Sequence, residues 1–150
     1  MGGTMKEQST NELAETLSRV RNEEELSVYL AEIRKREHEL SLSNYLNSVM
    51  HAKALALRNV VLESGLEQHY AYQIINGNKL NPSRIKVLAL CIACHMTVEE
   101  TQHALVISRQ GILCPFDIFD AIVMYHLNRE DWSVYAINEN LHAEGLPIIE

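Results

Sequence analysis

The chain has 150 residues, of which 47% are hydrophobic and 22% charged, and its formal net charge is −7. These values exclude an intrinsically disordered chain and suit one domain, or one domain with an appended helical segment. The low content of proline and glycine, 3 and 6 residues, disfavours a turn-rich β-sandwich. The acidic balance argues against a nucleic-acid partner.

Three features of the sequence predict a cytoplasmic protein without a membrane partner. The longest apolar run, residues 87–94, is shorter than the roughly 20 residues that a membrane span requires. The first ten residues contain no apolar stretch, so no secretory signal is expected. The 3 cysteines are an odd number, which does not make a disulfide framework and indicates a reducing compartment.

Apolar residues recur at helical spacing along almost the whole chain, and strand-like alternation is absent, so we expect an all-α fold. Capping residues, prolines and glycines divide the chain into about nine predicted helices. These helices are expected to begin at Thr10 or Asn11, after Asn22, at Ser41 or Ser43, near Ala56, at Glu67, at Pro82, at the Thr97–Glu100 capping box, at Pro115 and at Ser133.

The charge is distributed unevenly along the chain. Residues 1–52 carry 6 basic and 9 acidic side chains, residues 53–108 carry 5 and 4, and residues 109–150 carry 2 and 7. The middle segment is therefore the only one that is not acidic. Its charge balance removes the simple objection to a nucleic-acid partner for this part of the chain.

The middle segment contains two short predicted helices joined by a tight turn. The first helix covers residues 58–64 and the second covers residues 68–76, and Gly65 lies where the turn needs a residue that tolerates a positive φ. Leu66 is expected to fill the turn as its apolar residue. The small Ala71 would let the two helices approach closely.

This pattern resembles the lambda-repressor-like, Cro-type helix-turn-helix family. The resemblance covers roughly residues 42–107, and residues 114–147 are similar to the C-terminal helical extension of a bacterial subgroup. The residues that carry it are Ser64-Gly65-Leu66, Tyr72-Gln73-Ile74, Asn76-Gly77, Pro82-Ser83, Leu88-Ala89 and Thr97–Thr101. The resemblance implies a five-helix core that binds double-stranded DNA, regulates transcription and acts as a dimer.

The resemblance also implies site residues, because the second helix of the pair would lie in the DNA major groove. A Gln amide can pair with adenine through two hydrogen bonds, and His or Tyr can donate to bases or phosphates. The base-reading residues implied in this way are Gln68, His69, Tyr70 and Gln73. The implied phosphate contacts are Arg58, Asn78, Lys79 and Arg84. The alternative for the same helix face is a solvated or protein-contacting surface.

Two positions depart from the family's pattern. The first helix of the pair usually follows a Gly-apolar-Ser/Thr turn and a polar phosphate-contacting residue, whereas residues 53–57 here read Lys-Ala-Leu-Ala-Leu. Arg58 would supply the phosphate contact one position later. Acidic Glu67 precedes the reading helix, where it would cap the helix but also approach phosphates.

The segment Cys91-Ile-Ala-Cys94-His95 matches the pattern of covalent haem attachment. Both thiols fall inside a predicted helix where small buried residues are needed, so we expect packing and no haem, zinc or other cofactor. His95 is expected to end that helix. We find no Ser-His-Asp set, phosphate-binding glycine loop or carboxylate pair that would indicate an enzyme.

The sequence thus predicts a flexible N-terminus over residues 1–8, a helical segment over 9–40, the helix-turn-helix domain over 41–108 and a helical extension over 109–150. Two functions stay open. One is a dimeric DNA-binding transcriptional regulator, and the other is a non-catalytic protein-interaction module on the same fold that has lost DNA binding. The terminal helices, including the apolar cluster Phe116, Ile118 and Phe119, are candidates for dimerisation or for a regulatory protein partner.

Overall fold

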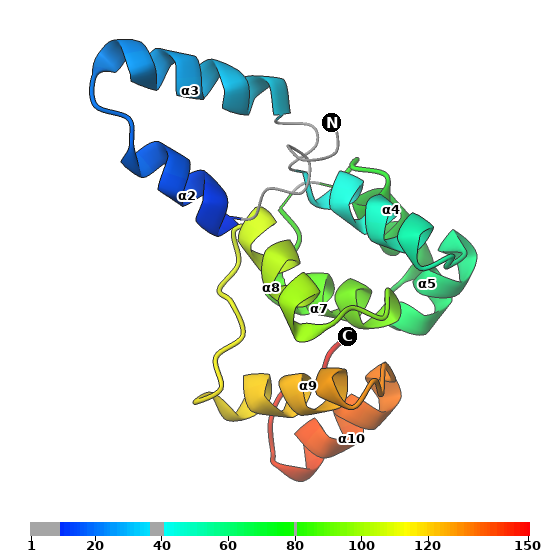
Figure 1. Ribbon diagram of the computed structural model, residues 1–150. Coiled ribbons are helices and arrows are strands. Elements are labelled where there is room, and N and C mark those ends of the chain that lie inside the picture. The colour runs from blue at the N-terminus through cyan, green and yellow to red at the C-terminus, as the bar shows by residue number, and fades with distance from the viewer. Residues whose placement is uncertain (1–9, 37–40, 80) are drawn as a thin grey trace. The chain divides into compact units, whose positions relative to one another are not determined.

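The computed structural model describes residues 10–36, 41–79 and 81–150, and every regular element in these ranges is a helix (Figure 1). The prediction of an all-α fold is confirmed. The helices are α2 (Thr10–Ser18), α3 (Glu23–Arg36), α4 (Leu42–Ala52), α5 (Leu57–Ser64), α6 (Gln68–Ile75), α7 (Arg84–Ala93), α8 (Val98–Ile107), α9 (Ile118–Asn128) and α10 (Val134–Ala143). The chain divides into two compact units, Met1–Ser41 and Leu42–Glu150. The predicted flexible residues 1–8 lie outside the described ranges.

In the first unit, the start of α3 is held by a reciprocal cap. The Glu25 backbone N–H donates to the Asn22 side chain at 2.8 Å, and the Glu25 carboxylate accepts from the Arg21 backbone N–H at 3.0 Å. Acidic residues occupy the first turn of α3 and basic residues its last turn, which complements the helix dipole. The helix start predicted after Asn22 is confirmed.

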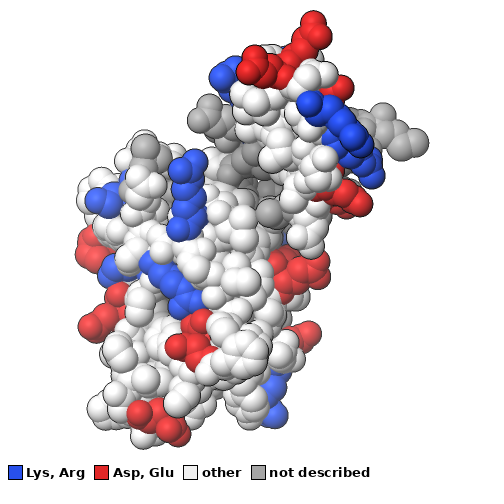
Figure 2. All heavy atoms as spheres, turned by 90° about the vertical axis from the view of Figure 1, so that its left-hand side faces the viewer, with Lys and Arg blue, Asp and Glu red and all other residues white. Residues whose placement is uncertain are grey.

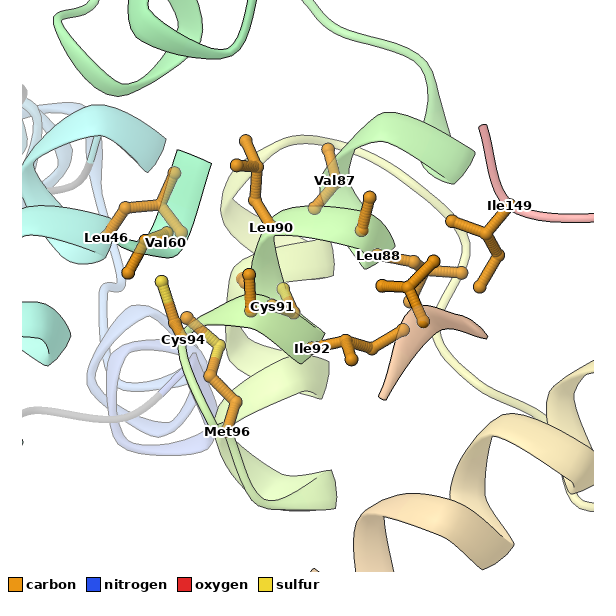
Figure 3. Packing of buried hydrophobic residues seen from close by; sticks show 14 of the residues in the cluster. Leu46, Val60, Val87, Leu88, Leu90, Cys91, Ile92, Cys94, Met96 and Ile149 are labelled. Carbon is orange, nitrogen blue, oxygen red and sulfur yellow. The ribbon is translucent and has the colours of Figure 1, made fainter. Parts of the chain in front are cut away.

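The second unit is built around α7, which is buried on all sides. Its residues from Val87 to Ala93 are all buried, and α5, α8 and α10 pack against it. Figure 3 shows Leu88, Leu90 and Ile92 pointing from this helix in different directions into the surrounding apolar side chains. A helix that is apolar on every face is stable only when other elements cover it. Helix α7 therefore defines where the core of this unit lies.

The two thiols of the Cys-x-x-Cys-His segment belong to this core. Cys91 and Cys94 are fully buried, and burial raises the pKa of Cys94 to about 12 and that of Cys91 well above its ordinary value. The prediction that both pack as small apolar side chains is confirmed. Within the described ranges, no three His, Cys, Asp or Glu side chains lie together as metal ligands would.

Two predicted helix ends depend on left-handed backbone conformations, and both are confirmed. Gly65 ends α5 with φ 72°. His95 follows α7 with φ 55°, and its backbone N–H donates to the Ile92 carbonyl at 3.0 Å. The predicted capping box of α8 is also present, since Thr97 and Glu100 each accept the other's backbone N–H.

Two predicted helix starts are wrong. Helix α7 begins at Arg84 and not at Pro82, because Asn81 has a left-handed φ of 57° and the Ser83 side chain caps the helix. Helix α9 begins at Ile118 and not at Pro115, because the Asp117 carboxylate accepts the Asp120 backbone N–H at 2.9 Å. In both cases a proline precedes a better capping residue, and the cap sets the boundary. None of the described helices has both the length and the apolar character needed to cross a membrane.

Candidate nucleic-acid interface

Helices α5 and α6 form a tightly packed pair that presents one helix face to solvent. Gly65 reverses the chain after α5, and Leu66 is buried behind the turn, where its N–H donates to the Ser64 hydroxyl at 3.2 Å. Ala71 has no exposed surface, so α6 lies close to its neighbours at that point. Helix α5 begins at Leu57, and its N-cap residue Ala56 provides no side-chain cap, so the usual capping residue is missing.

The start of α6 is fixed by Glu67. Its carboxylate accepts the His69 backbone N–H at 3.0 Å and the Tyr70 backbone N–H at 2.7 Å. These two hydrogen bonds to the charged form lower the pKa of Glu67. The predicted capping role of Glu67 is confirmed, and its negative charge lies next to the side chains at the start of α6.

Three of the four predicted base-reading residues share the outward side of α6. Gln68 and His69 are exposed, and the Gln73 amide lies 3.2 Å from the His69 ring nitrogen one helical turn earlier. On the opposite side of α6, Ala71, Ile74 and Ile75 are buried in the core. The outward polar side chains therefore stand on a helix whose position is fixed by packing.

Tyr70, the fourth predicted base-reading residue, has different surroundings. It is half-buried, and the amines of Lys79 and Lys86 lie 5.6 and 5.7 Å from the centre of its ring. These are distances at which an ammonium is attracted to an aromatic face. The Tyr70 ring in the first turn of α6 therefore attracts two lysine amines to this part of the surface.

Three of the predicted phosphate-contacting residues are exposed, namely Arg58, Asn78 and Lys79. The backbone N–H groups of Asn78 and Lys79 both donate to the Gln73 carbonyl, at 2.9 and 3.0 Å, so this loop is tied to the last turn of α6. The structure thus places the Lys79 backbone next to the C-terminal end of α6.

Arg84 does not belong to this group, and its assignment as a phosphate contact is corrected. Its guanidinium forms a two-pronged ion pair with the Asp120 carboxylate, with both N–O distances at 2.9 Å. The remaining donors bond the carbonyl oxygens of Gly111 and Ile112 at 2.8 and 3.1 Å. Asp120 is 4% exposed, so this pair joins α7 to α9 inside the protein. Its charge is already neutralised there.

Lys86 is a basic residue of this region that the sequence analysis did not single out. It is half-buried, and its amine donates to the Glu150 backbone oxygen at 2.7 Å as well as lying near Tyr70. Ser83 is the residue in the sequence that could have pointed to Lys86. Ser83 is a good capping residue, and a helix that begins after it, at Arg84, has Lys86 in its first turn. The prediction of a start at Pro82 concealed that position.

The charges around α6 are mixed in sign. Arg58 and Lys79 contribute exposed positive charge, whereas Glu63 and Glu67 contribute exposed negative charge. On the face of the molecule shown in Figure 2, the basic side chains likewise stand as separate groups among acidic and uncharged ones. The region offers hydrogen-bonding groups with limited positive charge. Comparison of the chain with protein-family models, with curated proteins and with solved structures found no match.

Proposed function

We propose that this protein is a non-catalytic, cytoplasmic DNA-binding regulator of transcription that reads bases with α6. The observation that carries the proposal is the outward face of that helix. Gln68, His69 and Gln73 are accessible on one side, while the other side is locked into the core. Glutamine and histidine side chains supply the donors and acceptors that match base edges in the major groove.

The arrangement of the surrounding helices supports the same proposal. Helices α4 to α8 follow one another in the sequence, and α6 packs on α4 and α5 while α7 packs on α5 and α8. We propose that these five helices are a lambda-repressor-like core, with α5 and α6 as its helix-turn-helix. In such a motif the first helix crosses the DNA backbone and the second enters the groove.

The corrected phosphate contacts make the proposal quantitative. With Arg84 withdrawn, Arg58 and Lys79 are the two cationic groups expected to approach phosphates in each copy, and Asn78 adds a neutral donor. Each neutralised phosphate contributes about −0.9 to the slope of log affinity against log salt. We therefore expect a slope of about −1.8 for each bound copy, which is shallow for a specific DNA-binding protein.

The experiment is a binding titration on random duplexes and on the DNA upstream of the protein's own gene, at several salt concentrations. The double change Gln68→Ala/Gln73→Ala should weaken binding to the preferred DNA more than binding to random DNA, by about 1–3 kcal/mol per lost base contact. Equal losses on both kinds of DNA would show that these side chains do not read bases. The exposed His142 on α10 provides a control, because His142→Ala should change neither affinity.

The second candidate is a protein-interaction module on the same fold, and the charge pattern favours it. The Arg84 charge is used inside the protein by Asp120, and Glu67 places an acidic group at the start of α6. Absence of any DNA binding at about 50 mM salt would favour this module over the regulator, because phosphate contacts are strongest at low salt.

A further inference from the structure

An exposed apolar surface of the second unit is formed by α9 and the residues just before it. Phe116 is 93% exposed, Ile118 is 62% exposed and Tyr125 is 53% exposed. Together with Ala121 and Ile122 they line a groove of about 380 Å³ that also reaches Asn140 and Glu144 at the end of α10. Exposed apolar side chains gathered in one place mark interaction surfaces.

The spacing of these residues is that of a second apolar stripe on one helix. Ile118, Ala121, Ile122 and Tyr125 recur at intervals of three and four residues, so they lie on one side of α9. A different side of the same helix is buried through Val123 and Leu127. The stripe with Val123 and Leu127 completes the core. We call the other stripe, Ile118, Ala121, Ile122 and Tyr125, the outer stripe of α9. Its spacing is typical of a helix that packs against another helix.

We propose that the outer stripe of α9 is the self-association surface of this protein, where α9 of a second copy packs in antiparallel orientation. The stripe is close to symmetric about its middle, so that reversing it brings Ile118 opposite Tyr125 and Ala121 opposite Ile122. A self-complementary patch of this kind suits a two-fold dimer interface. The small Ala121 at the centre lets the two helix backbones approach closely.

The two ends of α9 favour the antiparallel orientation through one pair of charges and through the helix dipoles. Asp117 caps the start of α9, and Arg129 ends it with its guanidinium 5.3 Å from the centre of the Tyr125 ring. The two charges are 12 positions apart along the chain, about 18 Å along a helix. Antiparallel copies place Asp117 of each copy toward Arg129 of the other and also oppose the helix dipoles. Parallel copies would place the two Asp117 carboxylates at the same end and would align the helix dipoles.

The Arg84–Asp120 ion pair gives this surface a rigid base. Asp120 also accepts the Cys114 backbone N–H at 2.9 Å, so the carboxylate holds both the start of α9 and the loop before it against α7. The surface is consequently present in the single copy and needs no folding on association. The proposal does not rest on DNA binding, because it concerns the free protein.

The first test measures the mass of the full chain in solution by sedimentation velocity over a range of concentrations. We expect a dimer, and we expect Ile118→Glu to weaken the dimer at least about tenfold, because it buries an unpaired carboxylate in the interface. Ile118 is exposed at the first position of α9, where glutamate suits the helix dipole, so the fold should persist. The matched control is Leu62→Glu, on the exposed side of α5, which should remain dimeric.

The second test determines orientation by cross-linking. In a Cys114→Ser background, mixing the Ile118→Cys chain with the Tyr125→Cys chain should yield a disulfide between unlike chains, and either chain alone should yield little. Three results would each overturn the proposal. They are a chain that is still monomeric at about 100 μM, a dimer whose stability does not change with Ile118→Glu, and efficient cross-linking of position 118 to position 118 of the second copy.

Discussion

Helices α6 and α9 both turn one side to solvent, but the chemistry of the two sides differs. On α6 the exposed side chains are Gln68 and His69, with Gln73 beside them, and all of them can be satisfied by water. On α9 the exposed side chains include Ile118 and the ring of Tyr125, and their apolar surfaces gain nothing from water.

This difference decides how far each face supports a function. A polar face is stable in the free protein whether or not it has a partner, so its function depends on hydrogen-bond chemistry and must be tested by binding. An apolar face costs free energy until it is covered, so the exposure of the outer stripe of α9 supports the proposal of self-association. The predictions below probe the two faces, beginning with the largest expected effect.

Removing the ion pair beneath α9 should have the largest effect. Arg84→Ala leaves the Asp120 carboxylate, whose side chain is 6% exposed, without its cation, and we expect unfolding to become easier by about 3 kcal/mol in chemical denaturation. This value is at the low end for buried pairs because the Arg84 side chain is 28% exposed. The matched change Arg58→Ala removes an exposed arginine and should cost less than about 0.5 kcal/mol. Equal costs would show that the pair does not hold α9 in place.

Neutralising a cation beside α6 should weaken DNA binding and leave stability almost unchanged. Lys79→Gln removes one expected phosphate contact, which should lower the affinity roughly eightfold at about 0.1 M salt and reduce the magnitude of the salt slope by about 0.9. The same change at the exposed Lys35 of α3 serves as the control and should alter neither quantity. An unchanged slope for Lys79→Gln would exclude Lys79 from the interface.

Removing the acidic cap of α6 should have a smaller effect of the opposite sign. Glu67→Ser keeps a side-chain acceptor at the cap but removes the negative charge, so DNA affinity should rise about threefold, the size expected for one exposed charge. Glu99→Ser, in the first turn of α8, is the corresponding control. A drop in affinity after Glu67→Ser would indicate that the carboxylate itself contacts the ligand.

The smallest effect concerns His103 of α8, which is half-buried. Burial lowers the pKa of His103, whose ring contacts Tyr45 edge-on at 4.7 Å. The folded state therefore binds a proton less readily than the unfolded state. Neutral His103 therefore contributes to the free energy of unfolding at a pH above its unfolded-state pKa of about 6.5. This contribution is lost as the pH falls through the lower pKa that His103 has in the folded state. His103→Gln should reduce the fall in melting temperature between about pH 7.5 and 5.5, whereas His142→Gln should leave it unchanged.

The features that the sequence predicted correctly are those coded over a few neighbouring residues. The helical period, the left-handed positions at Gly65 and His95, and the capping box at Thr97 each depend on contacts within about one helical turn. The burial of Cys91 and Cys94 was predictable as well, because they lie within and directly after a continuous apolar stretch of α7. Local chain physics acts on these positions in any fold.

Tertiary structure decided what the local pattern left open. Arg84 pairs with Asp120 across 36 positions, and no local pattern distinguishes that ion pair from a phosphate contact. Helical periodicity likewise revealed that residues 118–125 are apolar, but it could not show that one stripe would be covered by the core and the other left exposed. Charge pairing and burial depend on which distant segments meet, and only the packed chain determines that.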